Sequence, residues 1–291
     1  MNRTTIDIGG PVSIIEYGGT GPLAVCVHGL EGSAYNWRLI ADDLTKTHTV
    51  IAPDLVGFGY TEPLGRPVTV EANAELVADV IDHYGGPSLL VGNSMGGLIS
   101  ILTAGQHPDR VSALVLIDPA GPVADWSRLK PRTALTLGTS MIPGIGTALV
   151  EQYRATRTSD EAVMESYEFV AADPTIVSDA AFADALEIAE LRRQQPWSPH
   201  ALTSASRSIA PYVLTKRHFL RSLHKVTQPT LLIHGASDTV VQRETAMWIA
   251  RQRPDWSVVY LEGIGHIPMI ESPSTMMRVF RTWEAALLER S

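Results

Sequence analysis

The chain has 291 residues, of which 45% are hydrophobic, a formal net charge of −8 and one cysteine. This length and apolar content allow one large domain, with or without an inserted cap. The negative charge argues against binding to the phosphate backbone of nucleic acids, the single cysteine excludes disulfides within the chain, and no Cys/His cluster has the spacing of a zinc site.

Residues 1–7 contain no apolar stretch of the kind that forms a signal peptide, which favours a cytoplasmic protein. Two charge-free stretches, residues 87–106 and 133–150, are long enough to resemble membrane spans. The first reads better as a strand followed by a helix, and the second is interrupted by Pro143 and by glycines. We therefore expect no integral membrane segment.

The first strong strand pattern, residues 24–28, ends in a turn that contains Gly29 and Leu30. Its cysteine, Cys26, is expected to be a small core residue. His28 stands at the end of the strand, and we expect it to brace the turn through a side-chain hydrogen bond rather than to take part in chemistry.

Residues 89–97 read Leu-Leu-Val-Gly-Asn-Ser-Met-Gly-Gly, and a helix-compatible run follows at residues 98–104. Ser94 has glycine two positions before it and two positions after it, which is the Gly-x-Ser-x-Gly pattern of a nucleophile elbow between strand and helix. Such a serine adopts a strained backbone conformation that lifts its hydroxyl clear of the sheet. Side chains at Gly92 and Gly96 would collide where strand and helix pass each other. Ser94 is therefore the predicted nucleophile.

Attack by a serine on a carbonyl group creates a negatively charged oxygen that needs hydrogen-bond donors. The backbone N–H of Met95 lies at the start of the predicted helix, where it has no partner inside the helix. The backbone N–H of Leu30, in the turn after the first strand, is the natural second donor. We predict that these two groups form an oxyanion hole.

A serine hydroxyl also needs a base, which is itself oriented by an acid. Among nine histidines, His266 follows a predicted last strand at residues 256–261 and lies in the sequence Gly-Ile-Gly-His. The helix after it has Ser272 as a predicted N-cap and Pro273 in its first turn. His266 is the predicted base, whereas His234, which lies in a His-Gly setting like that of His28, is expected to be structural.

Two aspartates follow apolar strands and satisfy the chain order Ser, Asp, His. Asp118 follows the run at residues 113–117, and Asp238 follows a run that begins at Thr230. Asp238 comes after the penultimate strand, from which its carboxylate can meet the outer nitrogen of His266. We favour Asp238 as the acid and keep Asp118 as the rival, since it is also placed to begin an insertion.

Alternating strands and helices with short connections predict an α/β fold with a mostly parallel, doubly wound sheet. The alternation stops after Gly121, and residues 122–225 read as a helical cap inserted into a core formed by residues 1–121 and 226–291. The expected cap helices are Gly146–Arg157, Asp160–Ala172, Ser178–Gln194 and Pro211–Leu223.

These motifs together resemble those of the α/β-hydrolases over nearly the whole chain. The matching motifs are His28-Gly29, Pro53–Tyr60, the elbow at residues 92–96, Gly235–Asp238 and Gly265–Glu271. The resemblance places the catalytic roles on Ser94, Asp238 and His266, and it implies no cofactor and no metal. Tyr60 departs from the family, which often has serine there.

A serine at the elbow argues against dehalogenases and epoxide hydrolases of this superfamily, which use aspartate. The resemblance favours a capped carboxylic ester hydrolase, similar to monoacylglycerol lipases, acting on a small apolar or acyl-chain substrate. Apolar cap residues are expected to line its pocket: Met141, Ile142, Ile145, Phe169 and Trp197.

Two other functions stay open. The elbow Gly-Asn-Ser-Met-Gly-Gly also resembles that of carbon–carbon bond hydrolases that act on meta-cleavage (dienoate) products. Those enzymes need a cap arginine for the substrate carboxylate, for which this chain offers Arg154, Arg157, Arg192 and Arg193. A non-catalytic ligand-binding member of the fold can retain the same triad. The sequence also leaves open a homodimer.

Overall fold

The computed structural model describes residues 1–128, 138, 142 and 144–289. Its strands form one sheet in the spatial order β1-β2-β4-β3-β5-β6-β7-β8. Their bounds are Asn2–Asp7 (β1), Pro11–Gly18 (β2), Leu23–Val27 (β3), Thr49–Pro53 (β4), Ser88–Asn93 (β5), Val111–Ile117 (β6), Thr230–Gly235 (β7) and Ser257–Leu261 (β8). The pairs β1–β2 and β2–β4 are antiparallel and the other pairs are parallel. The mostly parallel sheet predicted from the sequence is confirmed.

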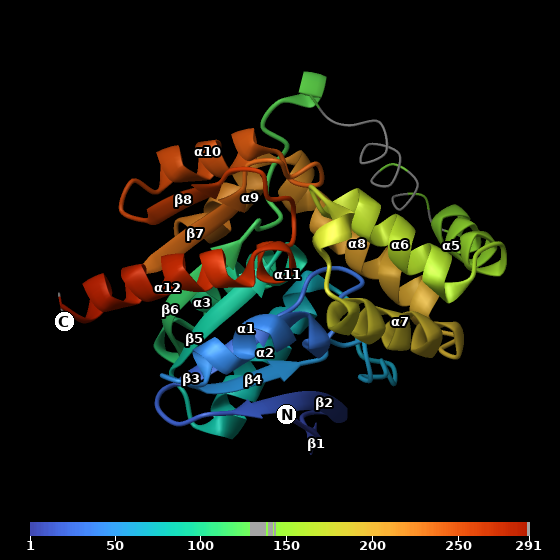
Figure 1. The fold of residues 1–291 in the computed structure, drawn as a ribbon, viewed down its shortest axis with the longest axis horizontal. Helices are drawn as coiled ribbons and strands as arrows, with labels where there is room; N and C mark the ends of the chain where they lie inside the picture. The colour runs from blue at the N-terminus through green and yellow to red at the C-terminus, as the bar shows by residue number, and fades with distance from the viewer. Residues whose placement is uncertain (129–137, 139–141, 143, 290–291) are drawn as a thin grey trace.

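Helices cover both faces of this sheet (Figure 1). The helices of the core are α1 (Arg38–Leu44), α2 (Val70–Tyr84), α3 (Met95–Gln106), α10 (Arg243–Gln252), α11 (Pro268–Glu271) and α12 (Pro273–Leu288). Buried side chains of α2, α3 and α10 pack in one cluster, and those of α1 and α12 pack in the other. The fold is therefore doubly wound, as expected.

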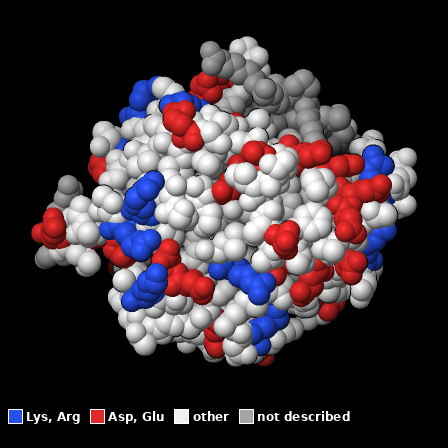
Figure 2. Space-filling model, in the orientation of Figure 1, with Lys and Arg blue, Asp and Glu red and all other residues white. Residues whose placement is uncertain are grey.

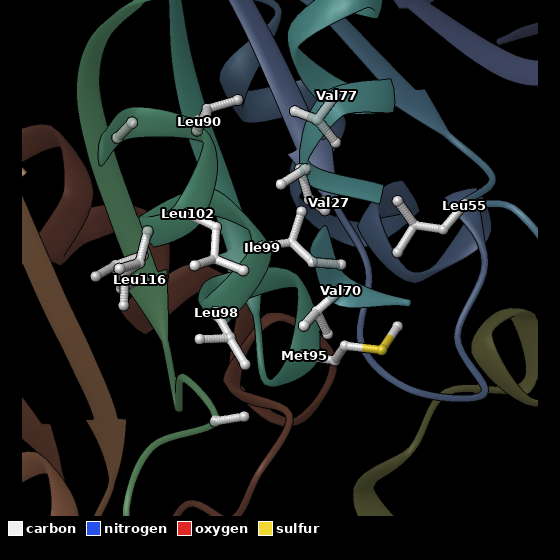
Figure 3. Packing of buried hydrophobic residues seen from close by; sticks show 14 of the residues in the cluster. Val27, Leu55, Val70, Val77, Leu90, Met95, Leu98, Ile99, Leu102 and Leu116 are labelled. Carbon is white, nitrogen blue, oxygen red and sulfur yellow. The ribbon is translucent and has the colours of Figure 1, made fainter. Parts of the chain in front are cut away.

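The strands are buried on both sides because successive side chains point to opposite faces of a sheet. Leu90 of β5 belongs to the α3 cluster, whereas its neighbours Leu89 and Val91 belong to the α12 cluster. Figure 3 shows Leu98 and Leu102 of α3 lying over this side of the sheet. Burial on both faces explains why these strands read as continuous apolar runs in the sequence.

A segment of helices lies between β6 and β7 and groups beside the carboxyl ends of the central strands (Figure 1). Its helices are α5 (Ile145–Ala155), α6 (Ser159–Val170), α7 (Asp179–Arg193), α8 (Ser198–Leu214) and α9 (Lys216–Leu223). Residues 122–225, which include these helices, are called the helical segment below.

The helix expected at Pro211–Leu223 is wrong in its bounds. Pro211 lies inside α8 rather than at a helix start, and the chain breaks instead at Thr215, whose φ is −128° and ψ is 99°. Proline costs an internal hydrogen bond, but Tyr212 and Val213 beside it are buried in the core cluster. Packing of the apolar face therefore outweighs the local preference of proline.

The predicted N-cap at Ser272 is correct in position but not in its hydrogen bonding. Ser272 precedes α12, yet its side chain makes no cap hydrogen bond. Its N–H donates to the carbonyl of Pro268 at 2.9 Å and so closes the single turn of α11. Ser272 is the last residue of the α11 turn and also the residue before α12, and its backbone therefore does not adopt the usual N-cap conformation.

Residues 87–106 form β5 and α3, so the strand and helix expected in this charge-free stretch are confirmed. In the second charge-free stretch, residues 133–150, positions 133–137, 139–141 and 143 lie outside the described residues. In the part of the chain that the structure describes, no helix combines the length and apolar character needed to cross a membrane.

Helix α6 of the helical segment is acidic. Helix α6 contains Asp160, Glu161, Glu165 and Glu168 and no basic residue, and Figure 2 shows red side chains gathered on this side of the molecule. Such a surface repels phosphate backbones.

Helix α3 packs very closely against the strands. A Cβ at Gly92 would lie 2.5 Å from both the carbonyl oxygen of Gly96 and Oγ of Ser100, whereas a Cβ at Gly96 would collide with the carbonyl oxygen of Val27 in β3. The expected strand–helix contact is therefore present at position 92, but position 96 faces the neighbouring strand. Both sites admit only glycine because backbone atoms cannot move aside.

We expect Gly96→Ala to destabilise the protein by about 3 kcal/mol or more, because the added methyl group meets backbone. The matched control is Gly65→Ala, where φ is +83° and no atom lies within 4 Å of a built Cβ; it should cost about 1 kcal/mol from backbone strain alone. Urea unfolding of both variants measures the difference. Equal losses would show that the close approach of α3 is not what fixes this glycine.

Candidate active site

Ser94 stands between β5 and α3 with φ 54° and ψ −117°. A non-glycine residue at positive φ costs on the order of 1–3 kcal/mol and persists only where its surroundings impose it. The Ser94 N–H donates to the carbonyl of Ile117 at 3.0 Å, and the Ser94 carbonyl accepts from the N–H of Ala120 at 2.9 Å. Ser94 is partly exposed, whereas its neighbours Asn93 and Met95 are buried. The turn is built as a nucleophile elbow requires.

Asp238 and His266 form a direct pair. His266 Nδ1 lies 2.6 Å from Asp238 Oδ2, and the side chain of Asp238 is fully buried. The other carboxylate oxygen, Oδ1, accepts the backbone N–H groups of Val240 and Val241 at 2.7 and 3.0 Å. The carboxylate is thus held at both oxygens, and His266 is oriented with Nε2 as its remaining ring nitrogen.

The two groups shift each other's protonation. Burial by itself raises the pKa of Asp238, but the charge of His266, the hydrogen bond to it and the N–H of Val240 hold that pKa below its ordinary value. Burial lowers the pKa of His266, yet Asp238, Asp118 and Glu271 outweigh it and raise that pKa above its ordinary value of 6.5. Both shifts favour the charged forms, the carboxylate of Asp238 and the imidazolium of His266.

Asn93 joins the serine elbow to the base. Its Nδ2 donates to the carbonyl of His266 at 3.0 Å and to the carbonyl of Ile117 at 3.2 Å. Among the described residues, Ser94 Oγ makes no hydrogen bond, and the link between serine and histidine runs through Asn93. Asn93 was assigned no role from the sequence, although a polar amide in a strand expected to be fully buried is a usable signal.

The turn after β3 lies against the elbow. A Cβ on Gly29 would be 3.2 Å from Cβ of Ser94 and 3.2 Å from Oδ1 of Asn93. The backbone N–H groups of Leu30 and Met95 donate to no protein group among the described residues. The structure therefore brings both predicted donors to the region of Ser94 with their N–H groups unused.

His28 braces this turn, as expected. Its Nδ1 donates to the carbonyl of Gly29 at 2.8 Å, and its Nε2 accepts the N–H of Leu55 at 3.0 Å. Both ring nitrogens are therefore occupied, and burial lowers the pKa of the ring. A neutral imidazole of one fixed tautomer serves the fold rather than proton transfer.

A second buried pair lies behind the first. Nδ1 of His234 is 3.0 Å from Oδ1 of Asp118, and both side chains are fully buried. Asp118 Oδ1 accepts the N–H of Gly235 at 2.8 Å, and its Oδ2 has no hydrogen-bond partner among the described residues. Burial raises the pKa of Asp118 to about 6. His234 therefore differs from His28: its ring faces a carboxylate, and neither ring nitrogen meets the geometry of a hydrogen bond among the described residues.

Ligand atoms of Asp118, His234 and Asp238 lie within 4.8 Å of one another. Asp238 already holds His266 and two backbone N–H groups. The cluster therefore reads as two linked Asp–His pairs rather than as a vacant set of metal ligands.

The four arginines named above have different partners in the structure. Arg157 is paired with Glu165 at 2.8 Å, and Arg193 donates to the carbonyls of Arg154 and Arg157 at 2.9 and 3.0 Å. Arg192 donates instead to the carbonyl of Glu31 in the turn after β3.

Arg192 and Arg154 are poorly neutralised. Nε of Arg192 is buried without a hydrogen-bond partner in the described part of the chain. Arg154 donates to Oγ of Ser198 at 3.2 Å and lies 3.9 Å from a carboxylate oxygen of Glu31. Burial, together with the neighbouring Arg154, lowers the pKa of Arg192. The charge of Glu31 thus acts on both arginines, with a smaller effect of Asp54 on Arg192.

The expected apolar pocket residues are scattered. Ile142 is 47% and Ile145 is 52% exposed, and Met141 lies outside the described residues. Trp197 borders a cavity of about 310 Å³ with residues 63–68 and α8, and no triad residue lines this cavity. Phe169 lies at the end of α6, and its backbone carbonyl accepts from Oγ1 of Thr239, the residue after Asp238, at 3.1 Å.

The chain resembles known proteins over most of its length. A family model described as "alpha/beta hydrolase fold" matches residues 22–141. The 2-hydroxymuconate semialdehyde hydrolase of Pseudomonas sp. (strain CF600) is 31% identical over 232 residues, which cover 74% of this chain and 70% of the relative. Lipase 3 of Moraxella sp. (strain TA144) is 28% identical over 258 residues, covering 87% of this chain and 74% of the relative. A thermophilic esterase from Thermogutta terrifontis superposes with a TM-score of 0.70 at 24% identity, covering 98% of this chain and 99% of that one.

The two aspartates should respond differently to substitution. Asp238→Asn is expected to lower kcat for ester hydrolysis about 10³–10⁴-fold, because the amide neither fixes the tautomer of His266 nor stabilises its cation. Asp118→Asn should cost less than about tenfold. It should also move the acid limb of kcat/KM to lower pH, since losing that carboxylate lowers the pKa of His266.

The pH dependence supplies the measurement. His266 acts as a base only when neutral, so activity of the wild type should rise with pH through an apparent pKa above 6.5, the ordinary value. A larger loss in the Asp118 variant than in the Asp238 variant would assign the acid to Asp118 instead.

Proposed function

The chain belongs to the alpha/beta hydrolase family, and within it we propose that it is a serine hydrolase of carboxylic esters with apolar or acyl-chain groups. The observation that carries this proposal is the 2.6 Å contact between His266 and Asp238 beside a serine held at positive φ. Relatives named lipases support ester bonds as the target.

In the proposed reaction, Oγ of Ser94 forms a bond to the carbonyl carbon of the ester while Nε2 of His266 takes the hydroxyl proton. Asp238 keeps Nδ1 protonated and stabilises the imidazolium. The N–H groups of Leu30 and Met95 donate to the carbonyl oxygen as it becomes negative, and each contributes about 3 kcal/mol to lowering the barrier.

The intermediate collapses when its bond to the alcohol oxygen breaks and His266 returns the proton to that oxygen. The acyl group stays on Ser94 as an ester. Water then attacks the acyl carbon and gives a proton to His266, which passes it to Oγ of Ser94 as the acid leaves. One ester and one water become one acid and one alcohol, and no cofactor takes part.

We also propose that the helical segment, residues 122–225, acts as a cap on the core. Three contacts with the loops of the site support this role. Arg192 donates to the carbonyl of Glu31, Oγ1 of Thr239 donates to the carbonyl of Phe169 at 3.1 Å, and the N–H of His266 donates to the carbonyl of Val170 at 2.7 Å. A cap held in this way shapes the pocket and limits the access of water.

Arg192 and Arg154 favour a second candidate, the cleavage of a carbon–carbon bond in a dienoate. Guanidinium groups with unused donors suit a carboxylate, which they bind through charge-assisted hydrogen bonds. Relatives named 2-hydroxymuconate semialdehyde hydrolase and 2-hydroxy-6-oxo-2,4-heptadienoate hydrolase support this candidate. The ester hydrolase remains the first proposal because the triad accounts for it without an added anion site.

The first test is hydrolysis of p-nitrophenyl esters with acyl chains of two to sixteen carbons by the wild type and Ser94→Ala. We expect turnover to peak at one chain length and to fall by at least about 10³-fold in the variant, which lacks the nucleophile. Absence of turnover with every ester would contradict the ester hydrolase. A binding protein would show saturable ligand binding that Ser94→Ala leaves unchanged.

The second test compares the mono-p-nitrophenyl ester of glutaric acid with p-nitrophenyl pentanoate, which lacks the distal carboxylate. If the arginines bind an anion, Arg192→Gln should lower kcat/KM for the half-ester about 10–100-fold, the equivalent of one charge-assisted hydrogen bond, and spare the neutral ester. Arg193→Gln, whose guanidinium bonds only backbone carbonyls, is the control. An equal loss of kcat/KM on both esters would indicate that Arg192 acts by holding the turn that contains Glu31, not by binding the carboxylate of the substrate.

A dienoate ring-fission product, followed by the loss of its absorbance, separates the two candidate reactions. Turnover of the dienoate well above that of either ester would replace the ester proposal.

A further inference from the structure

Glu271 is a buried carboxylate with no ion-pair partner in the part of the chain that the structure describes. It ends the single turn of α11, five residues after His266, and is 7% exposed. Among the described residues, its hydrogen-bond partners are backbone N–H groups: that of Gly265 at 3.0 and 3.1 Å from its two oxygens, and that of Ala172 at 2.8 Å from Oε2. A buried charge held only by backbone donors needs an explanation, because its burial is costly.

These two donors come from different parts of the fold. Gly265 precedes the base, whereas Ala172 follows α6 in the helical segment. The same two stretches touch directly, since His266 N–H donates to the carbonyl of Val170 at 2.7 Å. A Cβ on Gly265 would lie 2.5 Å from the nitrogen of Ala172. The base-bearing loop is thus packed on the helical segment, and Glu271 spans the junction.

We propose that Glu271 is a positioning residue for His266, acting by joining Gly265 to Ala172, and this inference rests on the proposed function of His266 as the base. Asp238 fixes the ring of His266 from one side, and Asn93 holds its carbonyl from another. Glu271 holds the backbone of Gly265, the residue that precedes His266. A base displaced by about 1 Å can lose on the order of 10²-fold in rate.

Glu271 also adds a negative charge near His266. The other titratable groups facing that ring are Asp238, Asp118 and, through them, His234. Removing the charge of Glu271 lowers the pKa of His266, so the acid limb of the pH profile moves to lower pH whatever residue replaces it. The position of His266 depends instead on an acceptor oxygen at residue 271. A variant that loses the charge but keeps an acceptor oxygen therefore separates the effect on the pKa of His266 from the effect on its position.

The test compares Glu271→Gln with Glu271→Ala in the full chain. The glutamine keeps an acceptor for Ala172 or Gly265 but loses the charge, so kcat should stay within about threefold of the wild type while the acid limb shifts to lower pH. The alanine should lower kcat on the order of 10²-fold, with KM changed far less. The exposed Glu262, which pairs with Arg243, supplies the control Glu262→Ala, which should change neither.

Labelling by a fluorophosphonate gives a readout independent of substrate binding, because the reaction at Ser94 needs the base in place. We expect Glu271→Ala to slow labelling as much as it lowers kcat, and Glu271→Gln to restore it. Thermal unfolding confirms that each variant is folded at the assay temperature. If Glu271→Ala does not fold, the inference rests on Glu271→Gln, for which a loss of kcat as large as 10²-fold would overturn it.

Equal labelling of the wild type and a folded Glu271→Ala would also overturn the positioning role. Failure of the wild type itself to label or to turn over any ester would instead contradict the proposed function.

Discussion

The close approach of α3 to the sheet is the constraint on which the site depends. Gly92 and Gly96 let the first turn of α3 reach backbone atoms of β3 and β5, and no other residue allows that distance. The turn between strand and helix must then be very sharp, and Ser94 takes a positive φ as a result. The same packing brings Gly29 close to Ser94, so the turn after β3 lies directly against the elbow. The geometry of the elbow therefore depends on the absence of side chains at positions 92 and 96.

The helical segment is bonded to three loops of the candidate site. It contacts the turn after β3 through Arg192, the acid loop through Phe169 and the base loop through Val170 and Ala172. A rigid-body movement of this segment would therefore break hydrogen bonds in all three places. The end of α6 in particular is tied to the backbone of His266 and to the side chain of Thr239.

Buried charge is concentrated behind the elbow in two linked pairs, Asp238 with His266 and Asp118 with His234. The sequence offers both Asp118 and Asp238 as the acid, because each follows an apolar strand at the same edge of the sheet. Geometry separates them: Asp238 reaches His266, whereas Asp118 faces His234 and the N–H of Gly235. The pKa of Asp118 is raised by burial, and the charge it keeps supports the imidazolium at a distance.

The sequence by itself determined the elements and the edge of the sheet at which chemistry-bearing residues gather. Strand periodicity and the glycine spacing around Ser94 depend on local backbone geometry, and the structure agrees with both. Local patterns failed where packing overrides them: Pro211 lies inside α8, and Ser272 serves two helices. They also gave no role to Asn93 or Glu271, and no means of choosing Arg192 among four arginines. Only the tertiary structure shows the contacts of these three residues, because each contact joins parts of the chain that are far apart in sequence.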